Sequence, residues 1–143
     1  MIQINPYLVF NGNCAEAFYF YKSVFGGEFT DFNKFGEMPT EDGQIMPDDL
    51  KEKIMHVSYN IGNSILMGSD ANPMQGKVVV GQNVSLSINT NSKEEADAIF
   101  NGLSVDGLIT MPLENTFWGA YFGMFTDKFG IMWMVNFDHQ STL

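Results

Sequence analysis

Residues 114–137, ENTFWGAYFGMFTDKFGIMWMVNF, decide the fold of this chain. They form two short runs of aromatic, methionine and β-branched residues, which are typical of strands with a buried face. Asp127-Lys128-Phe129-Gly130 separates the two runs and has the composition of a turn. The stretch therefore predicts an antiparallel hairpin whose two strands both contribute to the core.

A strand, a helix and a further strand precede this hairpin. Apolar and polar residues alternate over 83–88, and this alternation predicts a strand. Ser92-Lys93-Glu94-Glu95 is a capping box, which predicts that a helix starts there. Residues 107–113 form the next strand. The helix presents one buried stripe of apolar residues: Ala96, Ile99, Phe100 and Leu103.

The first half of the chain predicts the same order of elements. Asn13 is a candidate N-cap for its helix, and Gly26-Gly27 ends that helix. The segment Gly36–Lys53 contains prolines, glycines and acidic residues, so it predicts an exposed loop. The predicted elements are a strand over 2–10, a helix over 14–25, and strands over 28–35, 54–61 and 64–69.

The two halves align at a nearly constant offset, which indicates an internal repeat. The offsets are 78 from Phe10 to Ile88, 79 from Asn13 to Ser92 and 80 from Gly27 to Gly107. We therefore expect one α+β domain over 1–143, built from two tandem βαβββ modules. Module 1 covers about 1–70, a linker covers about 71–82, and module 2 covers about 83–138.

Composition excludes several classes of partner. The net charge is −10, and the seven Lys and Arg residues are scattered, which argues against a nucleic-acid-binding protein. The sequence contains neither a signal peptide nor an apolar run long enough to span a membrane, so we expect no membrane partner and a cytoplasmic location. The one cysteine, Cys14, lies in the apolar stripe of the first helix and is expected to be buried.

Several short motifs, spread over nearly the whole chain, resemble one family when taken together and in order. The motifs are Ile4-Asn5-Pro6-Tyr7-Leu8, Asn11-Gly12-Asn13-Cys14, Phe35-Gly36-Glu37-Met38-Pro39, Met67-Gly68-Ser69-Asp70, Phe117-Trp118-Gly119 and 126–136. They resemble the PhnB-like branch of the vicinal oxygen chelate superfamily, which includes glyoxalase I, the bleomycin-resistance proteins and the extradiol dioxygenases. Members often carry names such as demethylubiquinone methyltransferase, yet this sequence lacks a glycine-rich nucleotide loop after its first strand.

The resemblance implies that each module curls its sheet into a cup, with the helix on the convex side and a ligand on the concave side. Strand parity then gives the residues that line the cup. They are mostly polar residues or methionines: Asn5, Tyr7, His56, Ser58, Asn60, Met67, Asn83, Ser85, Met132, Met134 and Asn136.

The resemblance also identifies the positions at which metal-dependent relatives bind a divalent ion. These positions are approximately Asn5, Met67, Asn83 and Met134, and Met134 stands where relatives commonly have a glutamate. Amides and thioethers are poor ligands for a hard cation, so we expect no metal centre and no cofactor. An alternative is that His56 binds a metal together with Glu114 or Asp70, but the favoured interpretation is that His56 is a hydrogen-bonded wall residue.

The candidate site residues come from both halves. His56 and Glu114 are the candidate catalytic pair, with Glu114 as a general base. Trp118 is expected to stack on a flat ligand, to cover the core, or to take part in a dimer contact. Tyr121 and Phe122 fit the lining by either parity, and Tyr121 is favoured for its hydroxyl. The predicted ligand-binding set is Tyr7, His56, Met67, Trp118, Tyr121 and Met134.

These observations favour a metal-independent, homodimeric protein that binds a small organic ligand, and whether it is an enzyme stays open. One alternative is a lyase, isomerase or dioxygenase-like enzyme that depends on a divalent metal. A second alternative is a resistance protein that sequesters a drug.

Overall fold

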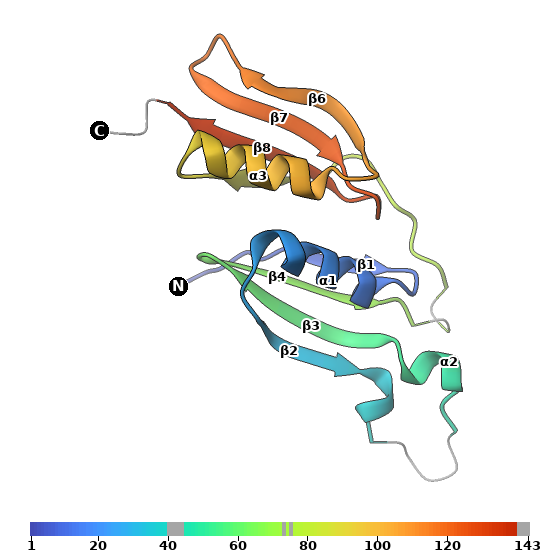
Figure 1. The fold of residues 1–143 in the computed structure, drawn as a ribbon. Helices are drawn as coiled ribbons and strands as arrows, with labels where there is room; N and C mark the ends of the chain where they lie inside the picture. The colour runs from blue at the N-terminus through green and yellow to red at the C-terminus, as the bar shows by residue number, and fades with distance from the viewer. Residues whose placement is uncertain (40–44, 73, 75, 140–143) are drawn as a thin grey trace. The chain divides into compact units, whose positions relative to one another are not determined.

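Each half of the chain forms one four-stranded mixed sheet with a helix along one face (Figure 1). The computed structural model describes residues 1–39, 45–72, 74 and 76–139. The chain divides into unit 1, Met1–Val79, and unit 2, Val80–Leu143, and each unit is described by itself.

Unit 1 has the strand order β1-β4-β3-β2. Strand β1 runs parallel to β4, and the other neighbours are antiparallel. The described residues between β2 and β3 contain two short helices, which replace parts of the predicted loop, and the first of them begins one residue before that loop. The elements are β1 (Tyr7–Phe10), α1 (Cys14–Phe25), β2 (Phe29–Lys34), η1 (Phe35–Glu37), α2 (Asp48–Lys51), β3 (Ile54–Ile61) and β4 (Ser64–Asp70).

Unit 2 repeats this topology with the strand order β5-β8-β7-β6, in which β5 runs parallel to β8. The α+β fold of two βαβββ modules is therefore confirmed, and so is the hairpin, because β7 and β8 pair antiparallel. The elements are β5 (Leu86–Asn89), α3 (Lys93–Leu103), β6 (Leu108–Asn115), β7 (Ala120–Thr126) and β8 (Met132–Asp138).

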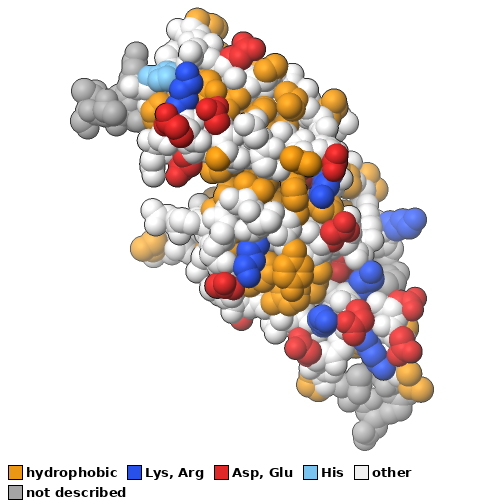
Figure 2. Space-filling model, viewed as in Figure 1, with side chains coloured by type: hydrophobic (Ala, Val, Ile, Leu, Met, Phe, Trp, Pro, Cys, Tyr) orange, Lys and Arg blue, Asp and Glu red, His pale blue; other side chains and the backbone are white. Residues whose placement is uncertain are grey.

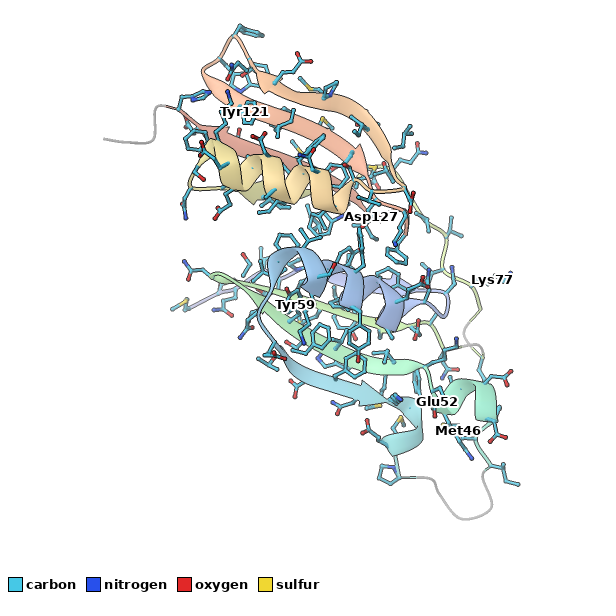
Figure 3. All side chains as sticks on the ribbon, in the orientation of Figure 1. Met46, Glu52, Tyr59, Lys77, Tyr121 and Asp127 are labelled. Carbon is cyan, nitrogen blue, oxygen red and sulfur yellow. The ribbon has the colours of Figure 1, made fainter. Side chains whose placement is uncertain are left out.

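Helix α1 buries its apolar stripe on one face of the unit 1 sheet. Phe18 lies so close to β4 that a Cβ atom at Gly68 would be 2.7 Å from the ring, so only glycine fits there. The buried strand residues below the helix include Tyr59, which lies on β3 (Figure 3). The helix contributes Cys14, Ala17, Phe18 and Tyr21 to this core.

Helix α3 covers the unit 2 sheet in the same way. The Phe100 ring meets the Phe125 ring edge to face at 5.1 Å, and a Cβ atom at Gly123 would be 2.7 Å from Phe100. Trp133 and Val135 of β8 are buried on this face, so this strand of the hairpin contributes to the core as predicted. Aromatic contacts of this kind add to the hydrophobic stabilisation from burial.

The buried carboxylate of Asp70 holds three segments of unit 1 together. Its Oδ1 accepts hydrogen bonds from the backbone N–H groups of Gly12 (3.0 Å) and Cys14 (2.9 Å), and its Oδ2 accepts one from Ile54 (2.8 Å). Asp70 ends β4, Cys14 begins α1, and Ile54 begins β3. Since a buried charge is tolerated only when it is well hydrogen-bonded, these three donors fix the ends of the three elements.

A second buried carboxylate, Asp127, fixes the turn between β7 and β8 (Figure 3). Its Oδ1 accepts from the backbone N–H groups of Phe129 (2.8 Å) and Ile131 (3.0 Å). Its Oδ2 accepts from the indole Nε1–H of Trp133 at 2.8 Å. The turn predicted from Asp127-Lys128-Phe129-Gly130 is thus held by the first of its residues.

Two predicted strands begin several residues later in the structure than in the sequence pattern. Strand β1 begins at Tyr7, and Ile2 and Ile4 are 92% and 94% exposed, so the predicted start of the strand was wrong. Pro6 lacks a backbone N–H, which ends the ladder at that point. Strand β5 begins at Leu86, and Val84 is 72% exposed.

We expect Asp70→Asn to lower the free energy of unfolding by about 1–3 kcal/mol, because the amide group of asparagine presents a donor to backbone N–H groups that need an acceptor. Urea unfolding followed by circular dichroism measures this change. The matched control is Asp49→Asn on exposed α2, which we expect to change stability by less than about 0.5 kcal/mol. Equal stability of the two variants would contradict the role of Asp70 as an anchor.

Candidate functional site

The face of each sheet that is not covered by its own helix is called the open face here. In unit 1 the register places Tyr7 of β1 opposite Met67 of β4, and Met67 opposite Ser58 of β3. Side chains that are opposite each other in register share a face, so these three residues lie on the open face. The alternate residues Val57 and Tyr59 are buried below α1, as parity predicts.

Tyr7 and His56 form a direct pair on this open face. The Tyr7 hydroxyl lies 3.2 Å from His56 Nδ1, and the two rings stack with their centroids 5.7 Å apart. Which of the two atoms donates the hydrogen bond depends on the imidazole tautomer. Tyr7 is 45% exposed and His56 is half-buried, so the pair can be reached by a ligand. A phenol next to an imidazole can bind a polar group and can move a proton.

Unit 2 presents a less polar open face. Met134 of β8 lies opposite Met124 of β7 and opposite Ser87 of β5. Phe122 shares this face, and the Trp118 ring in the turn between β6 and β7 meets it edge to face at 5.9 Å. Trp118 thus lies at the rim of the open face, where a side chain could contact a flat ligand.

Tyr121 lies on the other face of the sheet, the face covered by α3 (Figure 3). Its hydroxyl donates a hydrogen bond to Asp97 Oδ1 at 2.5 Å, and the Lys93 ammonium lies 4.7 Å from the centre of its ring. The hydrogen bond to Asp97 and the desolvation of the phenol raise the pKa of Tyr121 to about 12. The register therefore places Phe122, and not Tyr121, beside Met134.

Glu114 lies on exposed β6, opposite Phe122 in register. His56 belongs to unit 1 and Glu114 to unit 2, so their pairing as catalytic residues stays a prediction. Each residue is solvent-accessible within its own unit.

The positions at which the resemblance places a metal carry no carboxylate or imidazole. Met67 and Met134 lie at the centre of the two open faces, and Asn5 and Asn83 lie outside the strands. Two thioethers and two amides do not fit a hard divalent ion. Over the described residues, no three His, Cys, Asp or Glu side chains gather into a group that could hold a metal ion.

The Cys14 thiol is fully buried, as the sequence predicts. Desolvation and the nearby Asp70 carboxylate raise its pKa well above the usual range of a cysteine. A thiol that stays protonated is a poor nucleophile, so Cys14 acts as a small core residue.

Figure 2 shows acidic and basic side chains next to one another on the face in view, without a basic patch. The lack of a basic patch on that face is in line with the net charge of −10. None of the helices in the described part of the chain is both long and apolar enough to cross a membrane.

Sequence reasoning missed two features of the open faces. It did not anticipate the contact between Tyr7 and His56, which lie on strands separated by β4. It also did not place Met111 and Met124 on the open face of unit 2. The observation that places these methionines together is the register between β6 and β7, in which Met111 lies opposite Met124.

Comparison with known proteins identifies several similar chains. Residues 2–136 match the family described as 3-demethylubiquinone-9 3-methyltransferase. The curated protein YjdN of Escherichia coli (strain K12) is 36% identical over an alignment of 142 positions, and the match covers 93% of this chain and 93% of that protein. The crystal structure of protein PA1353 from Pseudomonas aeruginosa is 45% identical, with a TM-score of 0.85 over 96% of this chain and 98% of that one.

Two further solved structures carry descriptive names. A putative 3-demethylubiquinone-9 3-methyltransferase, PhnB protein, from Bacillus cereus is 25% identical, with a TM-score of 0.73 over 95% of this chain and 99% of that one. A glyoxalase-related enzyme from Fulvimarina pelagi is 17% identical, with a TM-score of 0.62 over 96% of this chain and 89% of that one. At that identity the second likeness concerns the fold alone.

We expect Tyr121 to ionise near pH 12, because ionisation would break its hydrogen bond to Asp97 and place two negative charges side by side. Asp97→Asn removes that charge and should lower the pKa of Tyr121 toward the usual ~10. The tyrosinate absorbance, measured as the difference between each protein and its Tyr121→Phe version, reports this one residue. An ordinary pKa in the unsubstituted protein would show that Tyr121 is not held by Asp97.

Proposed function

We propose a ligand-binding function for this chain, which belongs to the 3-demethylubiquinone-9 3-methyltransferase family in the PhnB-like branch of the vicinal oxygen chelate superfamily. The proposed ligand is a small organic molecule, and the proposed site is the open face of unit 1. The observation that carries the proposal is the contact between the Tyr7 hydroxyl and His56 Nδ1. The pair provides adjustable hydrogen-bond donors and acceptors on a face that its own helix leaves free.

The surroundings of the pair support a ligand with both polar and apolar parts. Met67 lies opposite Tyr7 in register and offers a flexible thioether surface. Asn33 lies opposite His56 and is half-buried, so a polar amide borders the same area, whereas Ser58 in the next open-face position of β3 is buried. A few polar groups among softer side chains are typical of small-molecule sites.

The proposed function does not include methyl transfer. Nucleotide-type cofactors are usually held by a glycine-rich turn between a strand and a helix of a parallel sheet. In this chain each sheet has a single parallel pair of strands, and the turn between β1 and α1 is Asn11-Gly12-Asn13. These features do not fit such a cofactor.

Catalysis and oligomerisation extend the proposal. If the protein turns over its ligand, His56 would carry the proton and Glu114 would be the candidate base.

We also propose a homodimer, because each sheet leaves two edge strands, β1 and β2 in unit 1 and β5 and β6 in unit 2. Light scattering of the purified protein measures the dimer directly.

A thermal-shift screen of small organic molecules tests the ligand site, because a ligand that binds only the folded state raises the melting temperature. For the strongest hit, Tyr7→Phe should raise the dissociation constant about 3- to 10-fold, which corresponds to one lost hydrogen bond. His56→Ala should abolish the shift while the melting temperature without ligand stays close to that of the parent.

The matched control for this experiment is the other histidine. His139 lies after β8 and contacts Asn115 Oδ1 at 2.9 Å, so His139→Ala changes an imidazole in unit 2. It should leave the ligand shift unchanged. Full retention of the shift by both Tyr7→Phe and His56→Ala would reject the site.

We propose that ligand binding is independent of divalent metal, since the four relevant positions are Asn5, Met67, Asn83 and Met134. Dialysis against a chelator should therefore leave the ligand shift unchanged. The measurement is elemental analysis before dialysis, followed by the same thermal-shift titration afterwards. A stoichiometric metal whose removal abolishes binding would favour the metal-dependent enzyme instead.

A further inference from the structure

Three methionines occupy paired positions on three adjacent strands of unit 2. Met111 of β6 lies opposite Met124 of β7, between two register irregularities of β6, and Met124 lies opposite Met134 of β8. We call these three residues the methionine row. All three are half-buried, and Ser87 of β5 continues the row beyond Met134.

The register brings the three thioethers within reach of one another. Neighbouring strands are about 4.8 Å apart, and side chains that lie opposite each other have Cβ atoms about 4.5–5.5 Å apart. Methionine has three rotatable side-chain bonds, so sulfur atoms on adjacent strands can turn toward a shared point. Met124 occupies the middle strand, so its sulfur can pair with either neighbour.

The chemistry of these donors selects one class of ligand. Thioether sulfur is soft and uncharged, and it prefers soft ions such as Cu(I) over Mg²⁺, Ca²⁺ or Zn²⁺. The residues on this rung of the sheet are three methionines and Ser87, so it presents no carboxylate that would attract a hard cation. We propose that the methionine row binds one soft monovalent metal ion, Cu(I) or its redox-inert analogue Ag(I).

The methionine row belongs to unit 2 and the site proposed above belongs to unit 1, and neither proposal depends on the other. The one thiol in the chain, Cys14, lies under α1 in unit 1 and is fully buried. Met132 lies on the same face as the row, but it is opposite Thr126 on the next rung. The register therefore places thioethers from three adjacent strands at neighbouring positions in the methionine row.

The experiment uses the full-length protein labelled with ¹³C at the methionine methyl groups and titrated with silver nitrate in chloride-free buffer. Met→Leu variants assign the methyl signals. We expect the signals of Met111, Met124 and Met134 to shift together and to saturate at one equivalent of Ag(I). The same titration of Cys14→Ala should give the same result, because no thiol is involved.

Met124→Leu provides the decisive variant, since leucine conserves the volume and apolar character of methionine but removes the sulfur. It should weaken Ag(I) binding by about tenfold or more, which corresponds to ~1.4 kcal/mol. The matched control is Met74→Leu, because Met74 is 91% exposed and lies outside both sheets. Met111→Leu on the edge strand is a second variant if Met124→Leu perturbs the spectrum of the free protein.

Two outcomes would overturn the inference. The first is a shift that is confined to exposed methionines such as Met74, which would indicate adventitious binding. The second is an unchanged affinity in both Met124→Leu and Met111→Leu, which would show that the row is an apolar surface whose sulfur atoms bind no metal.

Discussion

The carboxylate of Asp70 is the interaction on which the architecture of unit 1 depends. Removing a charge from water is costly, and the three backbone N–H groups that Asp70 binds offset that cost. Two of these donors, Cys14 and Ile54, begin α1 and β3, and Asp70 itself ends β4. Because β3 carries His56 and β4 carries Met67, the same carboxylate that closes the core also positions the open face.

Unit 2 reaches the same topology with a different set of polar contacts. Helix α3 has a local cap, in which Ser92 Oγ accepts a hydrogen bond from the Glu95 N–H at 3.0 Å. Asn13 makes no such side-chain bond at the start of α1, where Asp70 from the end of β4 binds the Cys14 N–H instead. The repeat is therefore one of strand order and register, whereas the polar anchors of each unit are its own.

The sequence predicted the features that depend on local periodicity. Alternation along β3 correctly separated His56 from Val57, because polar and apolar residues occupy different faces there. The same method could not separate Tyr121 from Phe122, since both faces of β7 carry aromatic residues and only pairing with β8 decides the parity. The role of Asp70 was also out of reach, because its partner Cys14 is 56 residues away in sequence.

The two glycines below the helices have a consequence for how this duplication can be traced. Gly68 of β4 lies opposite Val57 of β3, and Gly123 of β7 lies opposite Val135 of β8. The strand orders make β4 equivalent to β8 and β3 equivalent to β7, so the glycine and the valine have exchanged strands between the two units. The ring that fills the space has moved as well: Phe18 follows the first residue of α1 by four positions, and Phe100 follows that of α3 by seven. Compensating exchanges of this kind preserve the volume of a core while erasing position-by-position identity, so common ancestry of the halves would survive in shape long after it had faded from an alignment.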